Sequence, residues 1–171
     1  MNDLAVTILA ETADDAQAIE HLHERTFGPG RFAKTAYRLR ERTGHRPDLS
    51  FTARIGTLLV GSVWLTPVCI GEARALLLGP LTIEPPFRDR GIGLKLMQRL
   101  IDACEARGCR QMIAVIGDSA NAGSIGLHTR CGFDMIGTHP NVGLKFGRWL
   151  DTVMMQLALG EGATTVPSGN A

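Results

Sequence analysis

Residues 76–94 read LLLGPLTIEPPFRDRGIGL. In this stretch an apolar strand ends, two prolines forbid its continuation, and a Gly-x-Gly at Gly91 and Gly93 opens a helix. The two glycines let the backbone N–H groups of residues 90–94 point outward together at the N-terminus of that helix. Unpaired N–H groups and the positive end of the helix dipole make such a turn a pyrophosphate-binding site.

A Gly-x-Gly is compatible with other structures. A dinucleotide-binding fingerprint requires a third glycine where this chain has Leu96, and a Walker loop requires Gly-Lys-Ser/Thr, whereas Lys95 here follows Leu94. A tight turn between a strand and a helix, with no ligand at all, is the third alternative. The loop alone does not exclude it.

The strand before the loop carries a second signal. Gly79-Pro80 lies inside an apolar run and predicts a bulge, because a proline cannot donate a hydrogen bond to a sheet ladder. A bulge would separate this strand from the strand expected at 111–116 and leave free backbone groups on Leu81 and Ile83. The amides of an extended pantetheine arm could pair with those groups in the manner of an added strand.

A third signal lies downstream. Asn121, Ser124 and His128 recur at i, i+3 and i+7, the spacing that places side chains on one face of a helix. We expect this polar face to lie across from the gap that the bulge opens.

Together, these segments resemble the GNAT acetyltransferase superfamily in Leu81-Thr82-Ile83, in Arg88-x-x-Gly91-x-Gly93 and in Asn121…Leu127-His128-x-x-x-Gly132-Phe133. The resemblance implies an α/β GNAT fold, with a mixed, mostly antiparallel sheet flanked by helices and acetyl-CoA inserted between splayed fourth and fifth strands. The residues it assigns to acetyl-CoA binding are Leu81, Thr82, Ile83, Arg88, Asp89, Arg90, Gly91, Ile92, Gly93, Leu94, Asn121 and Ser124. The oxyanion would be held by backbone N–H groups around Leu81.

The subfamily signal is divided between the two halves of the chain. Residues from Arg110 onward are similar to phosphinothricin/methionine-sulfone N-acetyltransferases, whereas residues from about 27 to 93 resemble a different GNAT branch. The similarity assigns the catalytic histidine to His128. The catalytic glutamate of those enzymes corresponds to Leu78, so the usual carboxylate is missing from this chain.

The remaining elements follow from periodicity and turn residues. Helices are expected at residues 12–26, 31–42 (basic), 91–107 and 120–130. Strands are expected at 4–10, 111–116, 135–139 and 149–159, with an antiparallel meander at 49–55, 58–70 and 73–83. We expect one domain over residues 1–159 and a flexible tail over 160–171.

Composition sets limits on function. The chain has 171 residues, 44% hydrophobic and 20% charged, with a formal net charge of +1, which is typical of a globular protein and disfavours nucleic acid as a partner. We see no signal peptide and no membrane span, so we expect a cytoplasmic protein without a membrane partner. The four cysteines form no ligand-like pattern; no metal is expected, and buried reduced thiols are the favoured interpretation.

Transfer of an acetyl group to an amine requires loss of a proton from the ammonium, to a carboxylate, to His128 or to a water chain. Glu72 and Glu84 are not convincing bases, and His21, His23 and His45 are expected at the surface. On the acceptor side Lys145, Arg148 and Trp149 are candidates to hold an acidic, sulfonyl or phosphinyl group. The expected acceptor is the primary amine of a small amino-acid-like molecule and the expected assembly a homodimer. A peptide or protein N-acetyltransferase and a non-catalytic acyl-CoA-binding module are the alternatives.

Overall fold

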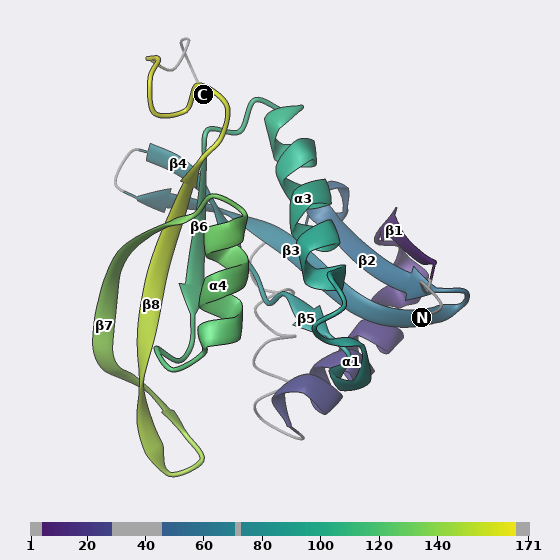
Figure 1. Ribbon diagram of the computed structural model, residues 1–171. Coiled ribbons are helices and arrows are strands. Elements are labelled where there is room, and N and C mark those ends of the chain that lie inside the picture. The colour runs from purple at the N-terminus through teal and green to yellow at the C-terminus, as the bar shows by residue number, and fades with distance from the viewer. Residues whose placement is uncertain (1–4, 29–45, 71–72, 167–171) are drawn as a thin grey trace. The chain divides into compact units, whose positions relative to one another are not determined.

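A computed structural model describes residues 5–28, 46–70 and 73–166 of the chain (Figure 1). These residues form two compact units. The first contains the chain as far as Pro67 together with Gly79–Cys104, and the second contains Val68–Leu78 and the chain from Glu105 onward. The helix expected at residues 31–42 lies outside the described residues.

The strands form a mixed, mostly antiparallel sheet, as predicted. Its hydrogen-bonded order is β1 (Val6–Ala10), β2 (Ser50–Ile55), β3 (Leu58–Ile70), β4 (Ala73–Leu78), β6 (Gln111–Ile116), β8 (Arg148–Ala158) and β7 (Asp134–Lys145), with β5 (Thr82–Ile83) beside β3. β4 and β6 run parallel, whereas β1–β2, β2–β3, β3–β5, β6–β8 and β7–β8 are antiparallel. A parallel pair requires a long crossover, and the chain from Gly79 to Arg110 provides it.

In the first unit, helices cover both faces of the β2–β3 pair. α1 (Ala16–Phe27), preceded by a 3-10 turn (Ala13–Asp15), packs through Ile19 and Leu22 against Trp64. α3 (Ile92–Glu105) lies on the other face, where Leu96 closely approaches the backbone of Gly61. Residues 61 and 64 point to opposite faces because side chains alternate along a strand.

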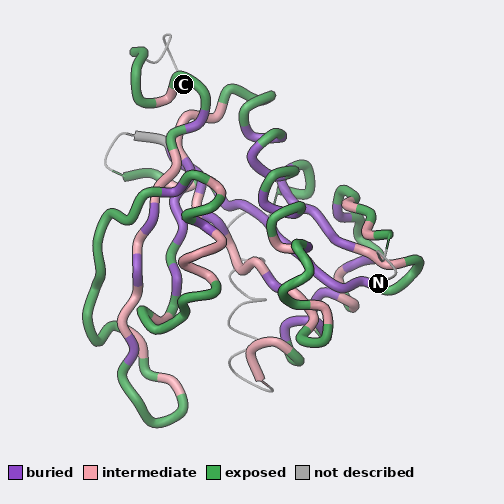
Figure 2. Tube along the Cα trace, in the orientation of Figure 1, coloured by how far each residue is buried: buried purple, intermediate pink, exposed green. Residues whose placement is uncertain are grey.

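In the second unit, α4 (Ala122–Arg130) follows β6, and β7 and β8 form a long hairpin. β7 is exposed along most of its length, as the green tube in Figure 2 shows. In β6 the residues Met112, Ile113, Ala114 and Ile116 are buried, but Val115 is 47% exposed. Burial in this strand therefore includes residues on both faces and is interrupted at Val115.

The strand expected at 73–83 is two strands rather than one. β4 ends at Leu78, and β5 begins at Thr82 and pairs with β3 instead. Gly79 directs its N–H to the carbonyl of Trp64 at 2.9 Å, and Pro80 has no N–H to donate. The predicted bulge is thus a complete break in the strand.

Two further expectations were wrong. His23 is fully buried on α1 rather than at the surface, whereas His21 is exposed and His45 lies outside the described residues. Of the four cysteines, Cys104 is buried and Cys69 is exposed, so the expectation of buried thiols does not hold for all of them.

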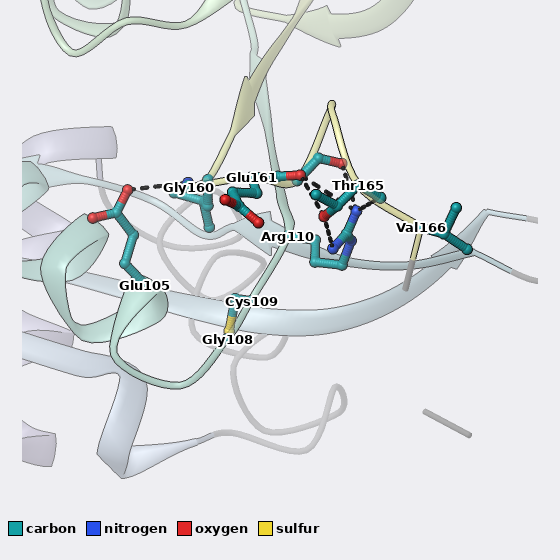
Figure 3. Close-up of a pocket in the computed structure, with 10 residues that line it drawn as sticks. Glu105, Gly108, Cys109, Arg110, Gly160, Glu161, Thr165 and Val166 are labelled. Atoms are coloured by element: carbon teal, nitrogen blue, oxygen red, sulfur yellow. Dashed lines mark hydrogen bonds between the residues drawn. The ribbon is translucent and has the colours of Figure 1, made fainter. Parts of the chain in front are cut away.

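The described part of the C-terminal tail turns back onto Arg110. Arg110 donates hydrogen bonds to the hydroxyl of Thr165 at 3.1 Å and to the carbonyl of Gly162 at 3.2 Å (Figure 3). Residues 167–171 lie outside the described part, and flexibility of the tail stays a prediction.

Candidate functional site

The start of α3 presents a row of backbone donors. The first helical hydrogen bond runs from Lys95 N–H to the carbonyl of Gly91 at 3.1 Å, so the N–H groups immediately before Lys95 have no partner within the helix. Asp89 (φ +59°) and Gly91 (φ +76°) both adopt left-handed conformations. These two residues bend the chain sharply into the helix.

The lead-in to the loop is fixed by short-range bonds. A 3-10 turn (Pro85–Phe87) directs Arg88 N–H to the carbonyl of Pro85, and the Arg88 Nε–H donates to the carbonyl of Ile83 at 3.3 Å. Arg90 lies with its guanidinium carbon 5.8 Å from the centre of the Phe87 ring. Both arginines are exposed and carry positive charge within the loop that leads into α3.

β5 attaches this loop to the sheet of the first unit. Thr82 is buried, and its hydroxyl bonds that of Ser62 at 2.7 Å. Ile83 pairs with Gly61, and the preceding Leu81 lies in the break before the strand. Most of the residues assigned to acetyl-CoA thus lie between Leu81 and Leu94, in the segment that runs from the strand break through β5 to the first turn of α3. At its end Ile92 is buried, Gly93 is half-buried and Leu94 is exposed.

The space beside Gly91 is open. A Cβ built on Gly91 meets no atom within 4 Å, so the surface above the loop is open. Open space, helix N-terminal donors and two arginines together fit a diphosphate group. These residues could therefore hold the phosphates of acetyl-CoA.

In the second unit, the three polar residues around α4 form a connected chain. The Asn121 side chain accepts a hydrogen bond from Ser124 N–H at 3.1 Å and caps the helix. The carbonyl of Ser124 in turn lies 2.7 Å from Nδ1 of His128. Asn121 is thus the cap of α4 rather than a residue on its face, and only Ser124 and His128 lie within the helix.

His128 is buried, with 4% exposure, and its ring packs edge-on against Phe133 at 5.2 Å. Since the Ser124 carbonyl can only accept, Nδ1 carries the proton and Nε2 is the basic nitrogen of the neutral ring. Burial lowers the pKa of His128, and the bond to Ser124 partly opposes that shift. At neutral pH the ring is therefore uncharged and able to accept a proton.

The residues expected on the acceptor side lie in the β7–β8 hairpin. Arg148 forms an ion pair with Asp118 at 2.6 Å, so its charge is compensated within the protein. Lys145 lies 5.0 Å from the centre of the Phe146 ring. Trp149 is 62% exposed.

Sequence reasoning missed one contact in the first unit, beside the turn that leads into the loop before α3. Glu84 bonds Arg25 of α1 across 59 sequence positions. No local pattern indicates such a long-range pair.

No group of three or more potential metal ligands occurs within residues 5–28, 46–70 and 73–166. A separate hollow of about 440 Å³ lies beside Arg110, lined by residues such as Glu105, Cys109 and Glu161 (Figure 3). It contains none of the predicted site residues.

Within residues 5–28, 46–70 and 73–166, no helix has the length and apolarity needed to cross a membrane.

A model of the acetyltransferase (GNAT) family matches residues 16–133, which is more than half of the chain. The chain belongs to this family. The match includes both the loop at the start of α3 and the segment through His128. It confirms the resemblance drawn from the motifs and the expected GNAT fold.

Relatives of this GNAT chain include two curated enzymes. It is 49% identical over 85 residues to a phosphinothricin N-acetyltransferase of Alcaligenes faecalis, covering 50% of this chain and 43% of that protein. It is 53% identical over 72 residues to an L-methionine sulfoximine/L-methionine sulfone acetyltransferase of Pseudomonas paraeruginosa, covering 42% and 41%. The matched segment thus spans less than half the length of these relatives.

A solved structure matches over nearly the whole chain. It is a GNAT superfamily phosphinothricin acetyltransferase from Sinorhizobium meliloti in complex with acetyl-CoA, with a TM-score of 0.78 and 32% identity. The match covers 95% of this chain and 93% of that one.

Proposed function

We propose that this protein transfers the acetyl group of acetyl-CoA to the primary amine of a small amino-acid-like molecule. The observation that carries the proposal is the open, donor-rich turn at the start of α3 in a chain of the GNAT family. Arg88 and Arg90 add charge that suits a diphosphate. The solved relative from Sinorhizobium meliloti, in complex with acetyl-CoA, supports the identity of the donor.

The choice of acceptor rests on the curated relatives. They are named for phosphinothricin and for methionine sulfoximine or sulfone, all of which carry an amino-acid amine. Because Arg148 is already paired with Asp118, we do not assign it to an acidic group of the acceptor. Lys145 and Trp149 remain proposed contacts.

We propose that His128 accepts the proton of the attacking ammonium. An ammonium with a pKa near 10 lies roughly 4 kcal/mol below its free amine at pH 7, so a base must assist. Leu78, which stands where the related enzymes carry a glutamate, is buried and supplies no carboxylate. His128 is neutral at this pH and keeps Nε2 unprotonated. The proton therefore moves from the ammonium to Nε2 and frees the nitrogen lone pair, which attacks the thioester carbonyl. The N–C bond forms, the C–S bond breaks, and CoA leaves as a thiolate that takes the second proton of the amine.

A turnover screen tests the proposal. Acetyl-CoA consumption is measured with free amino acids, methionine sulfone and sulfoximine, polyamines and peptides, and we expect the sulfone or sulfoximine to be acetylated. His128→Ala should lower turnover by roughly 10²–10⁴-fold and leave acetyl-CoA affinity unchanged. Thr129→Ala, which removes an exposed hydroxyl from the same helix, is the matched control.

Other results of the screen would contradict parts of the proposal. Preference for peptides over every free amino acid would favour a peptide or protein N-acetyltransferase. Acetyl-CoA binding that no amine converts into turnover would favour a non-catalytic acyl-CoA-binding module. A pH–rate profile that is the same in wild type and His128→Ala would reduce His128 to a structural residue.

We further propose a cytoplasmic homodimer. Large apolar side chains are exposed on the β7–β8 hairpin, which supports an interface there; they are Met135, Ile136, Val142, Leu144, Phe146 and Trp149. Exposed apolar surface of this kind is typical of protein interaction sites. A monomeric mass in sedimentation equilibrium would contradict the dimer.

A further inference from the structure

Glu84 lies between β5 and the turn that leads into the loop of the proposed phosphate site. Its backbone N–H donates to the carbonyl of Val60 in β3 at 2.8 Å, and its own carbonyl accepts from Phe87 N–H at 2.9 Å. The first bond ties Glu84 to the sheet, and the second closes the 3-10 turn that leads into Arg88. Any shift of Glu84 therefore moves the entry of the loop.

The Glu84 side chain is held by α1. The Nε–H of Arg25 donates to both carboxylate oxygens, at 2.8 and 2.9 Å. The Glu84 side chain is only 14% exposed, although that of Arg25 is 49% exposed. Arg25 lies in the last turn of α1, where the helix dipole also favours a cation. Its bond to Glu84 raises the pKa of Arg25.

The charge of Glu84 matters for the loop that follows it. A carboxylate only four positions before Arg88 would repel a diphosphate bound to that loop. Arg25 compensates this charge and at the same time fixes the carboxylate in place. The pair thus has an electrostatic effect and a positioning effect on the loop, although neither Arg25 nor Glu84 is itself a predicted site residue.

We propose that the Arg25–Glu84 ion pair positions the residue 88–94 loop for the phosphates of acetyl-CoA. The inference rests on the proposed function of that loop. Neither residue is a catalytic group, because neither is placed at the reacting atoms. The pair acts through the loop, so it should set the affinity for acetyl-CoA and leave the chemical step alone.

A double-mutant cycle tests the pair in the full chain. Arg25→Gln, Glu84→Gln and the double variant are titrated with acetyl-CoA by calorimetry. We expect each single variant to weaken binding roughly 3- to 10-fold and the double variant to be no weaker than the worse single one. With the best amine of the screen, KM for acetyl-CoA should rise and kcat should stay unchanged.

Two controls sharpen the result. Asp48→Asn breaks the Arg46–Asp48 pair, which has the same chemistry and lies outside the loop, and should leave acetyl-CoA affinity unchanged. S-acetylpantetheine, which has no diphosphate, should serve as acetyl donor equally well for wild type and the two single variants.

Three outcomes would overturn the inference. Glu84→Gln that binds acetyl-CoA as tightly as wild type or more tightly would show that the carboxylate only repels the ligand. Additive losses in the double variant would show that the two residues are not coupled. An equal loss with S-acetylpantetheine would show that the phosphates are not involved. If wild type does not bind acetyl-CoA, both the proposed function and the role of the Arg25–Glu84 pair are wrong. If wild type binds acetyl-CoA tightly and the variants bind it equally well, only the role of the pair is wrong.

Discussion

His23 is a fully buried imidazole on α1. Among the residues that the structure describes, neither of its ring nitrogens has a hydrogen-bond partner. The ring lies between aromatic neighbours, with its centre 5.3 Å from that of Trp64 and 5.7 Å from that of Phe27. Burial lowers the pKa of His23 from 6.5 to about 4, because an apolar environment disfavours the charged ring. His23 is therefore neutral in the folded protein at physiological pH.

This shift predicts a loss of stability in acid. Between pH 6.5 and about 4 the unfolded chain binds a proton at His23 and the folded chain does not, so the free energy of unfolding falls as the pH falls. Above pH 6.5 the neutral His23 does not lower the free energy of unfolding. By pH 4, protonation of His23 in the unfolded chain has lowered this free energy by about 3 kcal/mol. His23→Phe should remove this part of the pH dependence in urea unfolding, whereas His21→Phe on the exposed side of α1 should not. An unchanged slope in His23→Phe would contradict the assignment.

The burial of His23 had a signal in the sequence that motif-based reasoning overlooked. His23 follows the buried Ile19 by four residues and Leu22 by one, so it lies on the apolar face of α1. By contrast, the loop with Gly91 and the linked residues Asn121, Ser124 and His128 were recognised because their spacing is local. The Arg25–Glu84 pair could not be predicted, since its partners come together only when α1 packs beside β5.

The break between β4 and β5 depends on one close approach. Gly79 lies against the indole of Trp64, and a Cβ at this position would meet the indole Nε1 at 2.5 Å. The same residue donates its N–H to the Trp64 carbonyl. Glycine is thus required where the chain leaves β4 and turns towards the loop. Pro80 predicted a bulge in the strand, but whether the strand bulges or breaks depends on this contact between Gly79 and Trp64.

Gly79→Ala should therefore destabilise the fold. The added methyl group would lie closer to the buried Trp64 indole than van der Waals contact allows. The shift that relieves this overlap costs about 1–3 kcal/mol. Gly137→Ala in β7, where an added Cβ meets nothing within 4 Å, is the matched control and should change the melting temperature little. Equal melting temperatures for both variants and wild type would show that the indole yields easily and that the contact does not shape the break.

At the scale of the whole molecule, the residues assigned to the reaction divide between the two units. The loop from Arg88 to Leu94 belongs to the first, and the chain from Asn121 to His128 belongs to the second. Element order and the family were predictable from sequence, because hydrophobic periodicity and the Gly-x-Gly loop are local features. The domain boundaries stay predictions. The loop of the first unit and His128 of the second each have their own variant, so acetyl-CoA binding and proton transfer can be tested separately.

The central claim is that the turn at Gly91 binds acetyl-CoA. Valine at position 91 would require a β-branched residue at φ +76° and place a branched side chain in the open space above the loop. Gly108→Val is the matched control, because Gly108 also has a positive φ (+69°) with open space around its Cβ, but lies outside the loop. Acetyl-CoA affinity is measured by calorimetry on wild type and both folded variants. Binding should weaken by at least about tenfold in Gly91→Val and stay near the wild-type value in Gly108→Val. Wild-type affinity in Gly91→Val would contradict the phosphate-site assignment and the function built on it.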